Sequence, residues 1–156
     1  MYCQNFQIVH QEVPGELSLC FSISGCKLRC SGCHSPFLWK EKQGLLLTKE
    51  RLLNKLKTYQ DYASCLLFMG GEWHESELVE YLRMGKKMGY KTCLYTGEDC
   101  ISDTIRKELT WLKTGRWIPK LGGLDATTTN QKFIEVATNK TQNKLFIKPK
   151  QNDTTI

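Results

Sequence analysis

This sequence of 156 residues has no long apolar run, no internal repeat and no low-complexity segment. A transmembrane helix needs ~20 consecutive apolar residues, so no membrane association is expected. Residues 1–5 lack the basic region and apolar core of a secretory signal, which favours a cytoplasmic protein. Because no linker or shift in composition divides the chain, a single domain is expected over residues 1–156.

Dense clusters of basic residues are also scarce, although the net charge is +6. Most lysines and arginines are scattered, and the only local concentrations lie at 86–87 and 144–150. This distribution predicts a solvated surface and a basic C-terminal tail from about residue 148. Binding to nucleic acid is not expected, because it would favour a continuous basic stripe or face.

Apolar periodicity predicts strands that alternate with helices. Strands are expected at 17–23, 64–69, 92–95, 111–113 and 144–147, and helices at 49–59, 75–88 and 103–109. Such alternation is typical of parallel strands joined by crossover helices. The chain is too short for a complete eight-stranded barrel, which takes ~250 residues. The predicted fold is therefore α/β: a small partial (β/α) barrel with mostly parallel strands, open on one side.

Three segments with unusual composition each follow one of the predicted strands. A cysteine-rich loop, residues 24–39, follows the strand at 17–23. Gly70-Gly71-Glu72 follows the strand at 64–69, and Tyr95-Thr96-Gly97 ends the strand at 92–95. Because sites in parallel sheets lie at the carboxyl ends of the strands, the three segments are expected to meet on one rim.

Cysteine is abundant, with eight residues, of which five are well separated along the chain: Cys3, Cys20, Cys65, Cys93 and Cys100. Cys20, Cys65 and Cys93 lie in apolar runs, where a free cysteine behaves as a small buried hydrophobe. Three others lie within eight residues, in the spacing Cys-x3-Cys-x2-Cys: Cys26, Cys30 and Cys33. Such crowding in one loop indicates a metal centre.

The number of thiols discriminates between kinds of metal centre. A structural zinc ion takes four ligands, commonly as two pairs, and a second pair is missing from this loop. A [4Fe–4S] cluster normally takes four cysteines, so three of them leave one iron open. The amino and carboxylate groups of S-adenosylmethionine can chelate such an iron. The spacing alone does not decide between such a cluster and the alternatives, a zinc site or unrelated thiols.

The cysteine loop resembles the signature of the radical S-adenosylmethionine enzymes. Ser24-Gly25-Cys26, residues 32–36 and Trp39 are similar to the loop of proteins that activate glycyl-radical enzymes. The greatest similarity is to the activators of anaerobic ribonucleoside-triphosphate reductase. Tyr95-Thr96-Gly97 and residues 128–131 also resemble that family, so the resemblance runs from about residue 9 to residue 136.

Two positions depart from the pattern of the superfamily. Gly32 precedes the third cysteine, where many radical S-adenosylmethionine enzymes have an aromatic residue. Trp73 follows Gly70-Gly71-Glu72, where a proline is usual. Without the aromatic residue, the usual apolar cover of the cluster is missing at this position. Without the proline, the glycine turn is less constrained.

The resemblance implies an oxidoreductase that cleaves S-adenosylmethionine reductively with a [4Fe–4S] cluster. It further implies that the resulting radical takes a hydrogen from a glycine of the large anaerobic ribonucleoside-triphosphate reductase subunit. The electron would come from a low-potential donor such as flavodoxin. The open side of the partial barrel is the expected entrance for the glycine loop of the partner.

The resemblance also implies roles for individual residues. Cys26, Cys30 and Cys33 would hold the cluster and act in catalysis through it. The residues expected to bind the cofactors are Gly32, Cys33, His34, Gly70, Gly71 and Glu72. Trp39, Trp73, Trp111 and Trp117 are expected in the core or at a partner interface instead.

Two other functions compete with this reading. One is a radical S-adenosylmethionine enzyme that acts on a small molecule, although a chain this short could hardly close a polar substrate pocket without a second copy. The other is a non-enzymatic module that binds zinc or an iron–sulfur cluster. Metal analysis and the product of the reaction would separate the three.

Overall fold

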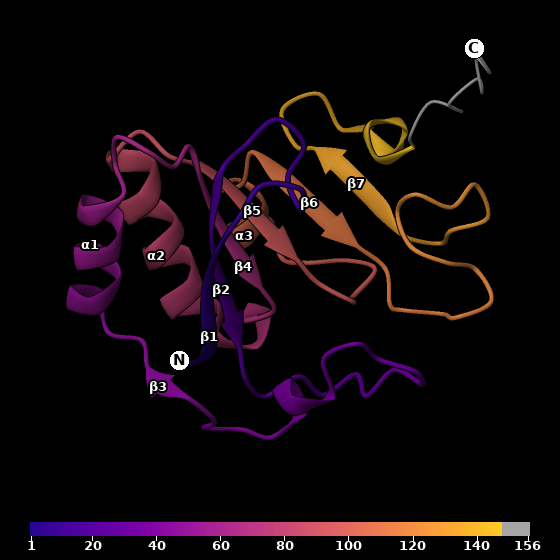
Figure 1. Cartoon of the computed structure of the whole chain (residues 1–156), viewed down its shortest axis with the longest axis horizontal. Coiled ribbons are helices and arrows are strands. Elements are labelled where there is room, and N and C mark those ends of the chain that lie inside the picture. Colours follow the sequence, from indigo (N-terminus) through magenta and orange to yellow (C-terminus); the bar gives the residue numbers. More distant parts are fainter. Residues whose placement is uncertain (148–156) are drawn as a thin grey trace, which may run out of the picture.

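A computed structural model describes residues 1–147, so the predicted basic tail from about residue 148 lies outside the described part. The centre is one eight-stranded sheet with the order β3-β1-β2-β4-β5-β6-β7-β8 (Figure 1). Its strands are β1 (Tyr2–Val9), β2 (Ser18–Ile23), β3 (Leu45–Leu46), β4 (Cys65–Met69), β5 (Lys91–Tyr95), β6 (Trp111–Thr114), β7 (Lys132–Glu135) and β8 (Lys140–Thr141). The helices are α1 (Lys49–Thr58), α2 (Glu75–Lys87) and α3 (Asp103–Arg106), with short 3-10 turns η1 (Pro36–Trp39), η2 (Glu72–His74) and η3 (Asn143–Phe146).

The predicted α/β class is confirmed, with parallel pairing confined to the middle of the sheet. Strands β2, β4, β5 and β6 run parallel to their neighbours in that group. The outer pairs, which join β1 to β2 and β3 and join β7 to β6 and β8, are antiparallel. A register shift between Cys3 and Asn5 breaks the alternation of β1, which explains why periodicity did not predict this strand.

The strand predicted at 144–147 is wrong. This segment begins with the 3-10 turn η3, and the sheet ends instead with β7 and β8. The side chain of Asn143 accepts a hydrogen bond from the backbone N–H of Phe133 and donates one to the carbonyl of Gln131. Phe146 then packs edge-on against Phe133, with the ring centroids 5.0 Å apart. Apolar residues here cover the sheet rather than extend it.

The two long helices form where the sequence predicts them. Thr48 caps α1 by accepting a hydrogen bond from the N–H of Arg51. Acidic residues begin α2 and basic residues end it, which suits the helix dipole. Gly85 lies against Leu66, where a Cβ would come within 2.7 Å of the leucine Cδ2. The third helix is shorter than predicted and ends at Arg106.

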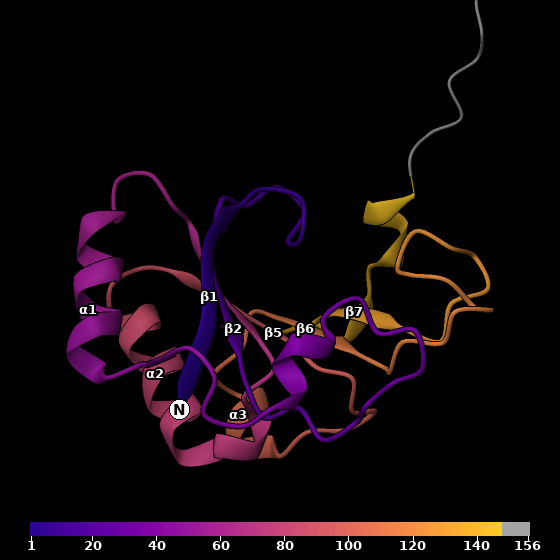
Figure 2. The same ribbon diagram turned by 60° about the horizontal axis from the view of Figure 1, so that its bottom comes forward.

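Alternation along the strands gives the sheet two different faces. Helices α1 and α2 cover one face of the sheet (Figures 1 and 2). On this face, Leu66 and Phe68 belong to the larger core with the buried leucines of the two helices. On the other face, which we call the inner face, loop residues Val13 and Leu124 cover a smaller core. The predicted burial of Cys20, Cys65 and Cys93 is confirmed, and all three belong to this smaller core. Within residues 1–147, no helix is long and apolar enough to cross a membrane.

Candidate active site at the carboxyl ends of the central strands

The predicted meeting of the three strand-end segments is confirmed by their contacts. The hydroxyl of Thr96, after β5, donates a hydrogen bond to Oε1 of Glu72, after β4, at 2.6 Å. Leu28 of the cysteine loop lies so close to Gly97 that a Cβ there would come within 2.4 Å of the leucine Cδ1. Segments from β2, β4 and β5 therefore form one continuous rim.

The cysteine loop is closed at its base and turns sharply at its tip. The N–H groups of Gly25 and Cys26 both donate to the carbonyl of Leu38, at 2.7 and 3.0 Å. At the tip, the N–H of Cys33 donates to the carbonyl of Cys30 at 3.2 Å, with Gly32 at a φ of 67°. Only glycine adopts this conformation without strain, which is a reason for Gly32 where many relatives have an aromatic residue.

The three thiols of the loop are half-buried and none forms a disulfide. Burial raises the pKa of the Cys26 thiol, and the nearby carboxylate of Glu72 adds to the effect. The N–H of Ser35 donates to the sulfur of Cys33 at 3.3 Å. Hydrogen bonds of this kind to a cysteine sulfur tune the potential of an iron–sulfur cluster.

The donor set fits a cluster better than a single ion. A structural zinc ion draws all its ligands to one point, whereas the cysteines of a [4Fe–4S] cluster bind different irons. Three separated thiols on one loop, each partly open to solvent, suit the second arrangement.

Glu72 presents a buried carboxylate oxygen toward this rim. Its Oε1 accepts from Thr96, while its Oε2 is buried with no hydrogen-bond partner among the described residues. Burial raises the pKa of this carboxyl group, and the bond from Thr96 opposes the rise. A buried oxygen without a partner costs free energy, so a ligand that carries a hydrogen-bond donor, such as an amino group, would be stabilised here.

The glycine turn before Glu72 is fixed by an aromatic ring in place of a proline. The N–H of Gly70 donates to the carbonyl of Tyr95 at 2.8 Å, which ties the turn to β5. A Cβ on Gly70 would come within 2.6 Å of Trp73, and one on Gly25 within 3.2 Å of the indole nitrogen of the same tryptophan. Trp73 therefore packs between the glycine turn and the cysteine loop, a role that the sequence did not predict.

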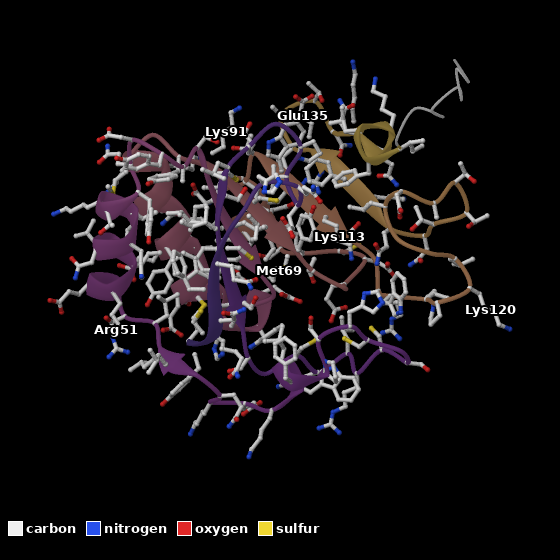
Figure 3. All side chains as sticks on the ribbon, viewed as in Figure 1. Arg51, Met69, Lys91, Lys113, Lys120 and Glu135 are labelled. Carbon is white, nitrogen blue, oxygen red and sulfur yellow. The ribbon has the colours of Figure 1, made fainter. Side chains whose placement is uncertain are left out.

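Lys113, at the carboxyl end of β6, is a site residue that the sequence analysis missed (Figure 3). Its Nζ donates to the carbonyl of Gly115 at 2.8 Å, and within residues 1–147 no carboxylate lies within ion-pair distance of it. Burial lowers the pKa of Lys113 to about 8, although the proximity of Cys30 works in the opposite direction. The sequence signal that could have identified Lys113 is its place at the end of a predicted parallel strand, where sites of such sheets lie.

An open cleft of about 540 Å³ lies beside the tip of the cysteine loop. His34 and Trp117 flank it with their ring centroids 4.4 Å apart, and Gly32 lies against Pro119. Trp117 comes from the irregular segment between β6 and β7, where periodicity carries no signal. The lining includes Cys33, His34, Tyr95, Lys113, Trp117 and Gln131.

The predicted site residues thus fall into two neighbouring groups. Cys33 and His34 line the cleft, and Gly32 packs beside it. Gly70, Gly71 and Glu72 lie on the adjacent part of the rim, where Glu72 is close enough to Cys26 to influence its titration. Lys113 belongs to the first group, because it lines the cleft with Cys33 and His34 and is influenced by Cys30.

Comparison with known proteins also points to an iron–sulfur site in this region of the chain. Residues 14–114 match the model of the 4Fe–4S single cluster domain family. The chain is 36% identical over 89 residues to a pyruvate formate-lyase-activating enzyme of Clostridium pasteurianum, a match that covers 53% of this chain and 37% of the relative. A pyruvate formate-lyase-activating enzyme of Staphylococcus epidermidis is 30% identical over 98 residues, which cover 58% of this chain and 39% of the relative.

The matched region spans less than half the length of these curated relatives. No solved structure matches the chain. The family match covers all three cysteines of the loop and the whole rim from β2 to β6, and it supports both predicted cofactors, a [4Fe–4S] cluster and S-adenosylmethionine. The chain therefore belongs to the 4Fe–4S single cluster domain family, within the radical S-adenosylmethionine superfamily that its cysteine loop resembles.

Proposed function

We propose that this chain activates a glycyl-radical enzyme and does so as a single cytoplasmic domain. The observation that carries the proposal is the meeting of the cysteine loop, the glycine turn and the end of β5 on one rim. A reduced [4Fe–4S] cluster held there by Cys26, Cys30 and Cys33 would supply the electron for the reductive cleavage of S-adenosylmethionine. The protein binds and orients these groups and excludes competing reactions.

Each part of the rim has a distinct task in this proposal. Cys26, Cys30 and Cys33 would hold the cluster, and the iron that three cysteines leave open would be available to S-adenosylmethionine. Gly70, Gly71 and the partnerless oxygen of Glu72 receive the amino group. The ammonium of Lys113, which lacks an acidic partner among residues 1–147, provides the charge that a carboxylate requires. His34 and Gly32 cover the cluster from the side of the cleft.

We further propose that the sheet is a partial (β/α) barrel whose open side admits the partner. The inner face has loops rather than helices over it, and the cleft beside His34 and Trp117 opens at the carboxyl ends of the strands. A glycine loop that enters this cleft would bring its α-carbon next to the cofactors. Exclusion of water by Trp117 and Tyr95 would protect the radical during the transfer.

The target of the activator is the second part of the proposal. The sequence of the cysteine loop favours the large anaerobic ribonucleoside-triphosphate reductase subunit, with a low-potential donor such as flavodoxin as the source of the electron. The names of the relatives favour pyruvate formate-lyase as a second candidate. Both targets carry the hydrogen on a backbone glycine, so the same site serves either one.

Electron paramagnetic resonance with both targets tests the proposal. The chain is loaded with iron and sulfide without oxygen, reduced, and mixed with S-adenosylmethionine and either purified target. We expect a glycyl-radical signal on the reductase subunit, with stoichiometric 5′-deoxyadenosine, and neither product with Cys30→Ala. A signal on pyruvate formate-lyase alone would move the assignment to that target.

Two outcomes would support the competing functions. Formation of 5′-deoxyadenosine and a modified small molecule without any protein target would indicate a different radical enzyme. Zinc bound at one ion per chain, with no acid-labile sulfide, would indicate a binding module instead. Cross-linking that places the glycine loop far from Gly32 and Gly71 would reject the proposed entrance.

A further inference from the structure

The two edges of the sheet differ in how well they are protected. At one edge, β8 has only two residues, one of which is Lys140. At the other edge, β3 pairs only with Tyr2 and Cys3, so residues 4–9 of β1 have no outer partner among the described residues. Natural edge strands are usually short or carry charge or proline, and β1 has eight residues with neither.

A groove runs beside this open edge. It has a volume of about 460 Å³ and lies between β1, the segment around β3 and α1. Partly buried Phe6 lies in its floor and packs on the buried ring of Phe21, with the ring centroids 4.9 Å apart. Leu45 is 71% exposed at one end. Every second residue of an edge strand directs its N–H and C=O outward, so the groove combines apolar surface with free backbone groups.

The charge of the groove is entirely positive. Arg51 and Lys55 of α1 line it, and none of its lining residues is acidic. Lys55 holds its ammonium 4.5 Å from the ring centroid of Phe6, and Arg51 donates to the carbonyl of Leu46 at 2.8 Å. Both cations therefore line the groove on the side of the sheet that α1 covers, next to the open edge of β1.

This charge discriminates between possible occupants. A second copy paired edge to edge would place its own α1 beside the first one. That helix carries four basic residues and one acidic residue, so the two would repel each other. An extended segment with acidic side chains meets the same cations with a favourable interaction.

We propose that the β1 edge binds an extended, acidic segment of a partner protein. The segment adds to the sheet as a strand next to β1, through backbone hydrogen bonds to residues 4–9. Because successive side chains of a strand point to opposite faces of the sheet, every second side chain of the segment projects on the side of α1, where acidic groups face Arg51 and Lys55. This docking site is distinct from the rim that holds the cofactors and does not depend on the proposed function.

The test uses fluorescence anisotropy with a labelled peptide of about eight residues that alternates valine and glutamate. We expect saturable binding to the full chain and none of a matched peptide of valine and lysine. The double variant Arg51→Glu with Lys55→Glu should lose at least about tenfold in affinity. Both side chains are exposed, so the fold should survive, which circular dichroism would check.

Two controls distinguish strand addition from non-specific electrostatic attraction between the peptide and the basic helix. Lys57→Glu changes an exposed charge on the same helix but outside the groove, and it should leave the affinity within about twofold. A peptide with alternate backbone nitrogens methylated should fail to bind, because it cannot pair with β1. No saturable binding, or an equal loss with Lys57→Glu, would overturn the proposal. A dimer that sedimentation shows to be lost in the double variant would assign the edge to a second copy instead.

Discussion

The hydroxyl of Thr96 donates to Oε1 of Glu72 at 2.6 Å, and this bond joins the turns after two neighbouring strands. It leaves the other carboxylate oxygen of Glu72 buried without a partner among the described residues. Since hydrogen bonds with charged groups are the stronger ones, this oxygen is the best placed atom on the rim to receive an amino group. Thr96 thus holds the carboxylate of Glu72 in a defined orientation.

Replacement of Glu72 by glutamine should therefore weaken the binding of S-adenosylmethionine by the cluster-loaded protein about tenfold. The reason is the loss of one charge-assisted hydrogen bond, while the shape of the side chain is kept. Isothermal titration calorimetry without oxygen would measure the affinity for S-adenosylmethionine. Glu75→Gln is the matched control, because this exposed residue begins α2 and should leave the affinity unchanged. Equal effects of both changes would contradict a direct role for Glu72.

Replacement of any cysteine of the loop by alanine should abolish the cluster. Iron and sulfide should fall from about four atoms of each per chain to less than one, because two thiolates cannot retain a cube with an open iron. Cys100→Ala is the control, since that exposed cysteine lies outside the loop. Full iron content in the Cys26→Ala, Cys30→Ala or Cys33→Ala protein would exclude that residue as a ligand.

Lys113→Met should have opposite effects on binding and on stability. Loss of the ammonium should weaken S-adenosylmethionine binding about tenfold, because the carboxylate would lose its counter-charge. Before iron and sulfide are added, the variant should be more stable than the original chain near neutral pH, by about 1–2 kcal/mol. A buried cation without an acidic partner is costly, and methionine removes that cost.

The pH dependence of this stability difference has a defined sign. Burial lowers the pKa of Lys113 from 10.5 to about 8, so between these values the unfolded chain binds more protons than the folded chain. The stability of the original chain therefore rises relative to the variant as the pH increases from about 8 toward 10.5. Urea unfolding at several pH values would measure the free energy of unfolding of both proteins. A difference between them that does not change with pH would show that Lys113 is not the titrating group.

Glu108 should stabilise the fold through its two cations. Burial alone would raise its pKa, but hydrogen bonds from Arg83 and Lys86 outweigh that effect and lower the pKa below its ordinary value of 4.5. Because the folded pKa is depressed, the stabilisation is present above the unfolded pKa and is lost as the pH falls through the folded value. Glu108→Gln should cost about 1 kcal/mol near neutral pH and little in acid.

Thermal unfolding would test this prediction, with Asp99→Asn as the control. Asp99 is exposed and forms no ion pair among the described residues, so its replacement should leave the melting temperature almost unchanged. A difference between the original chain and Glu108→Gln that persists unchanged at low pH would contradict the ionic origin of the stabilisation.

Local chemistry in the sequence determined the central part of the fold. Apolar residues at helical spacing are a short-range signal, and they placed α1 and α2 correctly. Strands β4, β5 and β6 were likewise found, because their apolar runs are bounded by clear breaks. The spacing of Cys26, Cys30 and Cys33 pointed to the cluster, since ligands within one loop need no distant partner.

The edges of the sheet and the details of the site were decided by the tertiary structure. Strand β1 has an irregular register, and β3 and β8 have two residues each, so only pairing with neighbours makes them strands. Phe146 is as apolar as a strand residue, but packing on Phe133 and side-chain bonds from Asn143 hold its segment in a turn. Lys113 and Trp117 became site residues because the sheet brings distant segments to one rim, and burial there depends on contacts that sequence spacing does not contain.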